Sequence, residues 1–291
     1  MNTTLLLNLA VNGMVEGLVI ALPALALTLV FGIARFPNAS AGDVMTAGAY
    51  AGYGGQVLFG GSLLLGVATG MAAMAVLSAV LYLLVFRKLA GRSGVYPLVA
   101  SIGLAFAIRS ALTLFLGHDQ RVFDMPIVRA MSFGPVRMVP SDIYIAATAL
   151  VAVAAVFALL HFTPLGRRMR AVADNPDLAR ACGISSGRVM LALWLVAGAV
   201  TGLGGVLIGL KTVVTPNMGW DLLLPAFAAT ILGTIGNPVG AVIGAVIIGV
   251  AQELSTPIVG FTYKIGVGFA ILLMVLLVRP QGLFAGNERV R

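Results

Sequence analysis

The chain has 291 residues, of which 60% are apolar and only 10% are charged, and its mean hydropathy is +1.05. About a quarter of the residues in a soluble domain are charged, so these charges are too few to coat a water-soluble globule of this size. Lipid must surround most of the chain, and in lipid only helices or closed barrels satisfy the backbone. The apolar runs are continuous, not alternating, which excludes an outer-membrane barrel. We predict an all-α, polytopic transmembrane helical bundle that forms one domain over residues 1–291.

The remaining composition excludes several other classes. The formal charge of +8 arises from residues between apolar runs, which is typical of charges that set membrane topology and not of a nucleic-acid surface. The single cysteine, Cys182, excludes an intrachain disulfide and a multi-cysteine metal site. His118 and His161 are interpreted as interfacial residues, so no metal or cofactor is expected. No basic region precedes the first apolar run, so we expect that run to be retained as a span and not cleaved as a signal peptide.

Nine apolar runs follow one another along the chain, and each is a candidate span of about 20 residues. The second, seventh and eighth runs are short or rich in glycine and are alternatively tilted, broken or re-entrant, which would leave about eight to nine spans. The runs cover residues 12–32, 41–58, 62–86, 96–116, 141–162, 189–210, 220–236, 238–254 and 262–278.

The distribution of basic residues predicts the orientation of these spans. With nine crossings and the N-terminus outside, twelve Lys and Arg residues fall in inner loops and five in outer loops. Cytoplasmic loops carry the excess of positive charge. We therefore predict an N-terminus outside and a C-terminus in the cytoplasm.

A polar segment follows the first apolar run. Pro37 and Asn38 should interrupt the helix there, and irregular backbone at membrane depth is tolerated only where it is buried in protein or lines water. One interpretation is a cytoplasmic-end loop in which Asp43 caps a helix. The other is part of a translocation path, with Asn38, Ser40, Asp43 and Thr46 facing a cavity.

Arg109 lies deep in the fourth run, where a charge is costly and needs a partner. We expect it to pair with an acid such as Glu16 or Glu253, or with backbone carbonyls. It is included with the candidate path residues, although the sequence favours a structural ion pair over binding of a substrate carboxylate.

Two hydrophilic loops are long enough to have structure of their own. Residues 117–141 are predicted to form a periplasmic loop. Residues 163–188 form an inner loop with a basic cluster at the membrane surface, made of Arg167, Arg168 and Arg170.

The inner loop contains the signals of a short helix. Asp174 and Asn175 are residue types that cap helix N-termini, Pro176 suits the first turn, and Asp177 complements the helix dipole. Gly183 favours the left-handed conformation that ends a helix. The loop is either an ordinary connector that contacts anionic lipid or a helix that inserts into a groove on a partner.

Glycines recur at every fourth position in several runs, a spacing that lets helices approach closely in lipid. The rows are Gly236, Gly240 and Gly244; Gly48 and Gly52; and Gly198 and Gly202. We interpret them as packing surfaces, either within the chain or against a partner.

Five segments in order resemble the Liv-type branched-chain amino-acid permeases of ABC importers, and the compact length resembles the H-type subunit. The inner loop TPLGRRMRAVADNPDLARACGISSGRV is similar to that family's cytoplasmic loop. The other four are GLVIALPALALTLVFGIARFPNASAGDVMTAGAY, GVYPLVASIGLAFAIR, GTIGNPVGAVIGAVIIGVAQEL and LVRPQGLFAG. The chain departs from the family pattern at Ala41 and Asp43, where a histidine and a glutamate are usual.

The resemblance implies a non-enzymatic, multi-pass subunit in the bacterial inner (plasma) membrane. Its partners would be a second permease of the M type, two cytoplasmic ATPase subunits and a periplasmic substrate-binding protein, with no nucleic acid. No Gly-Lys dipeptide of a phosphate-binding loop occurs in the chain, in agreement with ATP hydrolysis on other subunits. By the resemblance, the coupling helix that contacts the ATPase consists of Asp174, Asn175, Pro176, Asp177, Leu178, Ala179, Arg180, Ala181, Cys182 and Gly183.

The substrate implied by the resemblance is a branched-chain or similar amino acid. The alternatives are urea or a short amide carried by a permease of the same family, or a secondary transporter independent of ATPases. A secondary transporter needs an ion site near the bilayer midplane, for which Asp43 and the segment 233–238 are the candidates. A membrane enzyme has little support, because the sequence has no zinc motif or nucleophile elbow.

Overall fold

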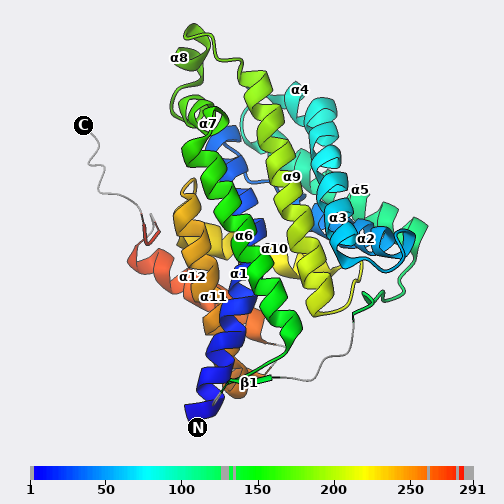
Figure 1. Cartoon of the computed structure of the whole chain (residues 1–291). Helices are drawn as coiled ribbons and strands as arrows, with labels where there is room; N and C mark the ends of the chain where they lie inside the picture. Colours follow the sequence, from blue (N-terminus) through cyan, green and yellow to red (C-terminus); the bar gives the residue numbers. More distant parts are fainter. Residues whose placement is uncertain (1–2, 126–130, 134–135, 261–262, 280–281, 285–291) are drawn as a thin grey trace.

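A computed structural model describes residues 3–125, 131–133, 136–260, 263–279 and 282–284. Within these residues the chain is almost entirely helical (Figure 1). The longer helices are α1 (Thr3–Ala34), α2 (Ala41–Leu58), α3 (Leu63–Leu81), α5 (Val95–Leu116), α6 (Pro140–Phe162), α9 (Ser186–Lys211), α10 (Met218–Leu232), α11 (Pro238–Val259) and α12 (Lys264–Val278). Each predicted apolar run corresponds to one of them.

Six helical segments are long and apolar enough to cross a membrane, namely 4–34, 63–89, 95–116, 140–162, 186–211 and 238–259. The helices α10 and α12 are apolar but shorter. The all-helical, polytopic membrane architecture predicted from composition is therefore confirmed. Arg129, Arg289 and Arg291, which entered the predicted charge distribution, lie outside the described residues.

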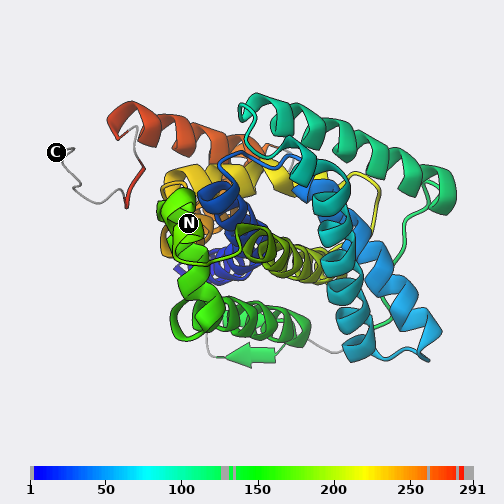
Figure 2. The same ribbon diagram turned by 90° about the horizontal axis from the view of Figure 1, so that it is seen from above.

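Helix α1 runs through the centre of the bundle. It packs most extensively against α11, and also against α9, α10 and α6. Ile20, Leu22 and Leu25 are fully buried at this centre. In the view from above, α1 is surrounded by the other long helices (Figure 2). A helix that is apolar on all sides suits such a position, because it meets protein in every direction.

The glycine rows pack helices within the chain. A Cβ atom added at Gly48 of α2 would lie 2.7 Å from the Cα of Gly202 of α9, closer than real Cβ atoms approach. Gly244 of α11 faces the backbone of α10 at Ala229 in the same way. Gly236 differs from the prediction. Its φ of 87° places it in the turn between α10 and α11, where glycine tolerates the left-handed backbone.

A short extended stretch separates α1 from α2. Arg35 ends the first helix with a φ of 62°, and residues 35–40 return into the bundle before α2 starts at Ala41. Phe36 anchors this stretch by stacking on Phe86, whose ring stacks in turn on Trp194 with centroids 4.5 Å apart. Phe86 ends a π-helical turn (Tyr82–Phe86) that continues α3 into the short α4 (Arg87–Leu89). The aromatic cluster thereby fixes where the interrupted segment runs.

The loop after α5 is attached to the bundle at two points. Arg121 and Val214 exchange backbone hydrogen bonds, which join this loop to the α9–α10 connection. The amide of Gln56 bonds both the carbonyl and the N–H of Asp124. A two-stranded antiparallel ribbon follows, formed by β1 (Met131–Phe133) and β2 (Val136–Met138). The ribbon lies near the N-terminus of α1, at the end of the molecule opposite α8 (Figure 1).

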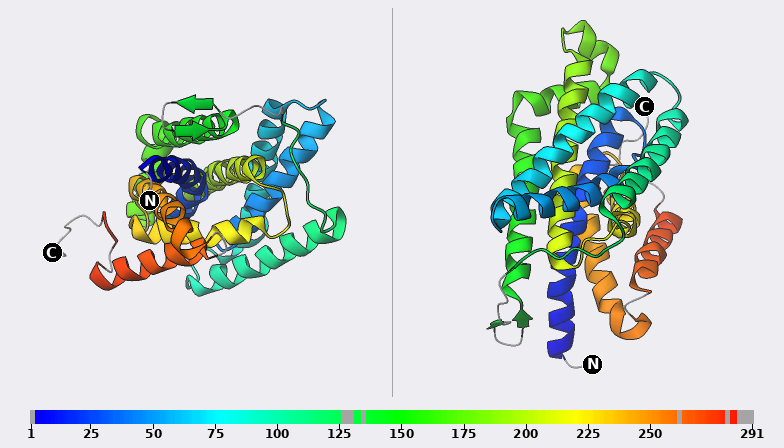
Figure 3. Two further views of the ribbon diagram at one scale, coloured as in Figure 1. Left: turned by 90° about the horizontal axis from the view of Figure 1, so that it is seen from below. Right: turned by 90° about the vertical axis from the view of Figure 1, so that its right-hand side faces the viewer.

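One broad face of the molecule carries α5 and α12 with α10 between and behind them. Both views along the bundle show this arrangement (Figures 2 and 3). Helix α5 is scarcely covered by the rest of the chain, since only Pro97, Ser101 and Ala105 of this helix are buried. The exposed side chains of α12 include Leu273, Met274, Leu277 and Val278.

Candidate functional site

The polar segment before α2 forms a compact helix start. The Oδ1 of Asn38 accepts hydrogen bonds from the backbone N–H of Ser40 at 3.1 Å and from its hydroxyl at 2.7 Å. Ser40 occupies the N-cap position. The interpretation of Asp43 as the capping residue is therefore wrong, because Asp43 lies in the first helical turn and its carboxylate points to another helix.

Asp43 and Arg109 form a buried ion pair between α2 and α5. Arg109 Nε donates to one carboxylate oxygen of Asp43 at 2.8 Å, and Nη2 donates to the other at 3.1 Å. The Asp43 side chain is fully buried and that of Arg109 is 19% exposed. This two-pronged geometry is the strongest form of such a pair, and it satisfies both charges in an apolar region.

Glu16 and Glu253, which were predicted as partners of Arg109, bind other residues. Lys264 at the start of α12 donates to Glu16 at 2.8 Å and to Glu253 at 3.0 Å. Lys211 lies 3.7 Å from Glu16. The expected pairing of Arg109 with Glu16 or Glu253 is thus wrong, since these residues join α1, α9, α11 and α12 to one another.

The start of α10 completes the surroundings of the pair. The Arg109 guanidinium lies 4.9 Å from the ring centroid of Trp220 and 5.7 Å from that of Phe106, distances at which cations and aromatic rings attract. The Thr46 hydroxyl accepts a hydrogen bond from the Gly219 N–H at 3.0 Å. The N-termini of α2 and α10 therefore meet beside Arg109.

The structure places the five predicted path residues in one region, where they contact different partners. Asp43 and Arg109 bind each other, Thr46 binds α10, and Asn38 and Ser40 start α2. Sequence reasoning missed Trp220, which is 37% exposed. A single tryptophan beside an acid in an apolar run does not predict a contact with an arginine more than 100 positions away.

This arrangement presents a polar patch at one side of the bundle. Both helix N-termini carry partial positive charge, and the guanidinium and indole offer N–H donors to an anionic group. Within the described residues no group of three or more His, Cys, Asp or Glu side chains is placed to hold a metal ion.

The short helix predicted in the inner loop is present as α8 (Pro176–Ala181). The Asn175 side chain accepts from the N–H groups of Asp177 and Leu178 at 3.0 Å each, and Gly183 follows the helix with a φ of 79°. Ala179 is buried, whereas Leu178 is 63% exposed. The helix projects beyond the bundle (Figure 1), so its solvent-facing side chains are free of the rest of the chain.

Sequence reasoning missed the helix that supports α8. Helix α7 (Pro164–Asp174) contains the three clustered arginines and buries Gly166, Met169 and Val172. Arg35 donates to the carbonyl of Ala173 on this helix. The basic cluster thus belongs to an amphipathic helix held against the end of α1, not to an irregular connector.

Comparison with known proteins identifies relatives along nearly the whole chain. Residues 9–278 match the family described as "branched-chain amino acid transport system / permease component". The high-affinity branched-chain amino acid transport system permease protein BraD of Pseudomonas aeruginosa is 28% identical over 96% of this chain and 95% of its own length. LivH of Escherichia coli is 27% identical over 95% of this chain and 94% of its own length.

A solved structure shares the fold. PsaBC from Streptococcus pneumoniae in complex with Fab aligns with a TM-score of 0.51 and 12% identity, covering 93% of this chain and 91% of that one. At this identity the likeness concerns the arrangement of helices alone.

Proposed function

Because this chain belongs to the branched-chain amino acid transport permease family, we propose that it is the membrane-spanning permease subunit of a binding-protein-dependent ABC importer. It translocates branched-chain or similar amino acids, and separate ATPase subunits supply the energy. The observation that carries the proposal is the extent of the match, which runs from residue 9 to residue 278 and covers 94–95% of the length of BraD and LivH.

The orientation follows from the charges and the order of helices. Nine helices cross in alternation, with the N-terminus outside and the C-terminus in the cytoplasm of a bacterial inner membrane. The arginine-rich helix α7 lies at the end of the molecule opposite the N-terminus (Figure 1). Basic residues favour the cytoplasmic side, so α7 and α8 lie there.

Helix α8 is the coupling helix that contacts an ATPase subunit. Its side facing away from the bundle carries Leu178, Ala181 and Cys182, all exposed. An exposed apolar face on a capped, projecting helix suits insertion into a groove on a partner. The N-cap bonds of Asn175 stabilise the start of the helix that presents this face.

A second permease, of the M type, covers the face formed by α5, α10 and α12. Phe106 on this face is 56% exposed and lies beside the charged Arg109. A charge near the lipid is unfavourable, and a partner permease removes it from lipid. The translocation path then runs between the two permeases, past Arg109 and Trp220.

The permease needs only weak contacts with the substrate along this path. A periplasmic binding protein supplies affinity and specificity, and the carboxylate of an amino acid passes the meeting point of α2 and α10. Arg109, already paired with Asp43, offers the guanidinium face without binding the substrate tightly.

Reconstitution with the partner subunits tests the proposal. We expect two ATPase subunits to copurify with the tagged chain, and leucine uptake into proteoliposomes to require ATP and the binding protein. Leu178→Asp should weaken ATPase binding at least about tenfold, a loss of roughly 1.4 kcal/mol. Val122→Asp is the matched control, because Val122 is also 63% exposed but lies in the loop after α5.

Three results would contradict the proposal. Uptake by the purified chain without ATP would favour a secondary transporter. Unchanged ATPase binding by Leu178→Asp would remove α8 as the coupling helix. Competition at the binding protein by urea, but not by leucine, isoleucine or valine, would assign the importer to amides.

A further inference from the structure

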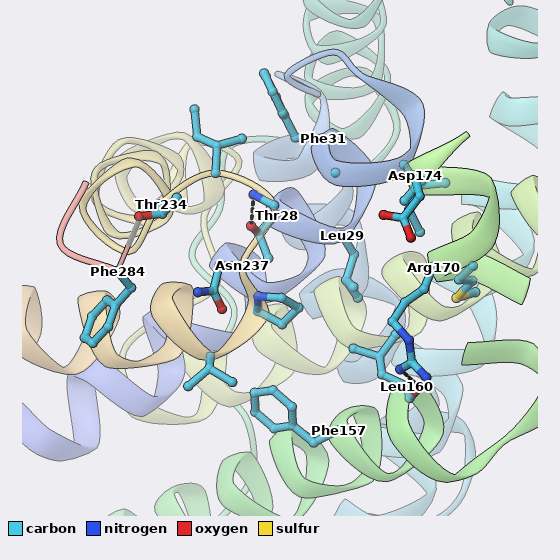
Figure 4. Close-up of a pocket in the computed structure, with 18 of the residues that line it drawn as sticks. Thr28, Leu29, Phe31, Phe157, Leu160, Arg170, Asp174, Thr234, Asn237 and Phe284 are labelled. Carbon is cyan, nitrogen blue, oxygen red and sulfur yellow. Dashed lines mark hydrogen bonds between the residues drawn. The ribbon is translucent and has the colours of Figure 1, made fainter. Parts of the chain in front are cut away.

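A cavity of about 660 Å³ opens at the end of the bundle that carries α7, which is the proposed cytoplasmic end, and Arg109 does not line it. It lies between the end of α1, the end of α6, helix α7 and the turn from α10 to α11 (Figure 4). Its volume is within the range of small-molecule sites, about 300–1,000 Å³. The proposed transport cycle assigns no role to this cavity.

The walls of the cavity are apolar. They include Leu29 of α1, Phe157 and Leu160 of α6, Val239 of α11 and Phe284 near the end of the chain. In Figure 4, Phe157 and Phe284 lie on the side of α6 and α11. Such walls suit a hydrocarbon chain better than a hydrated solute.

The rim of the cavity is basic. The residues that line it include three basic side chains, those of Arg35, Arg170 and His161, and one acid, Asp174. Arg170 Nη1 donates to the carbonyl of Leu160 and Arg35 Nη2 donates to the carbonyl of Ala173, bonds that hold both guanidinium groups at the cavity wall. The planar fork of an arginine is well suited to a phosphate.

The backbone around the cavity is held in uncommon conformations. Arg35 and Thr234 are the two non-glycine residues with positive φ in the described part of the chain, at 62° and 74°, and both line this cavity. The N–H of Gly236 donates to the Thr28 hydroxyl at 2.9 Å, which ties the turn to α1 (Figure 4). Strain of this kind concentrates at ligand sites.

We propose that this cavity binds an anionic phospholipid of the inner leaflet, with the phosphate at Arg35 and Arg170 and one acyl chain along the apolar walls. Basic pockets between helices on the cytoplasmic side suit anionic head groups. A free phosphate would use the rim but not the walls, so a lipid fits the whole cavity. The bound lipid joins α7, which supports the coupling helix, to the α10–α11 turn.

Lipid binding to the purified full-length chain tests this proposal independently of transport. The chain is delipidated in detergent and titrated with phosphatidylglycerol or phosphatidylcholine, and bound lipid is counted by native mass spectrometry. We expect one phosphatidylglycerol to bind in preference to phosphatidylcholine. Arg35→Gln/Arg170→Gln should weaken binding at least about tenfold, as expected for lost charge-assisted hydrogen bonds.

A matched variant separates this site from general charge. Arg167→Gln/Arg168→Gln removes the same charge from exposed positions on α7 that do not line the cavity, and it should bind phosphatidylglycerol like the natural chain. Val239→Trp fills the cavity without changing charge and should also weaken binding. It maintains the test if the Arg35→Gln/Arg170→Gln chain does not fold.

Several outcomes would overturn the proposal. Equal losses in the two arginine pairs would show binding to surface charge only. Glycerol phosphate that displaces the lipid at equal concentration would show an anion site without a lipid site. A photoreactive amino acid placed at Val239 that crosslinks to an ATPase subunit, and not to lipid, would show a subunit contact.

Discussion

Single residues in this permease matter chiefly where they neutralise charge inside the bundle. The Asp43 carboxylate is fully buried, and both of its oxygens bind Arg109. Removing one member of a buried pair leaves the other without compensation, whereas removing both can be nearly neutral. The pair connects α2 to α5, and a substitution that removes only one of its two charges should therefore destabilise the fold strongly.

Asp43→Asn should destabilise the chain by about 3 kcal/mol, because it leaves the Arg109 charge without its partner. The midpoint of thermal unfolding in detergent is the measurement. Asp43→Asn/Arg109→Gln should recover part of the loss. Asp119→Asn, at an exposed position in the loop after α5, is the control and should leave the midpoint unchanged. A double variant as unstable as the single one would show that the two residues do not act as a pair.

At the scale of elements, glycine determines how closely the helices approach. Gly48 and Gly202 bring α2 and α9 into backbone contact. In the same way, a Cβ atom added at Gly13 of α1 would lie 2.6 Å from the Cα of Val250 of α11. Helices in lipid associate through such close packing and not through a hydrophobic driving force. These contacts hold α2 at the position where Asp43 reaches Arg109.

Gly48→Ala should destabilise the chain by about 1–3 kcal/mol, the usual cost of overpacking, because its Cβ would collide with α9. Gly54→Ala in the same helix is the control, since nothing lies within 4 Å of its added Cβ. It should be neutral or stabilising by up to about 1 kcal/mol, as alanine favours helix more than glycine does. Equal unfolding midpoints for the two variants would contradict the close packing of α2 on α9.

At the scale of the whole molecule, the basic end and the N-terminus lie at opposite ends of the bundle. The inner loop forms two helices, α7 and α8, at the basic end, and the β1–β2 ribbon lies at the other end (Figures 1 and 3). The proposed orientation places the first of these ends in the cytoplasm. The single cysteine of the chain, Cys182, is exposed there and makes the orientation measurable without other changes.

A membrane-impermeant maleimide should label Cys182 in inside-out vesicles and not in right-side-out vesicles. Cys182→Ser/Asp119→Cys should show the reverse pattern, because residue 119 lies in the proposed periplasmic loop. Labelling of both chains from the same side would contradict the assigned crossings between α5 and α8. Labelling efficiency in each vesicle type, measured by mass shift, decides between these results.

The sequence predicted the helices and the local start of α8 well, because these depend on near neighbours. Continuous apolar runs marked each long helix, and Asn175, Pro176 and Gly183 marked the ends of the short one. It also placed Asp43 and Arg109 among the polar groups inside the bundle. Sequence reasoning did not find α7, although local signals mark it: the Thr163 side chain accepts from the N–H of Gly166, Pro164 suits the first turn, and the buried positions recur at helical spacing.

What the sequence alone determined is the class of molecule, since too few charges and long apolar runs leave lipid as the only suitable surroundings. The tertiary structure alone decided which charges meet. Arg109 binds Asp43, 66 positions away, while Glu16 and Glu253 bind Lys264. The physical reason is that a buried charge requires any opposite charge within reach. Which charge lies within reach depends on how glycines and aromatic rings place distant helices, and local sequence does not encode that placement.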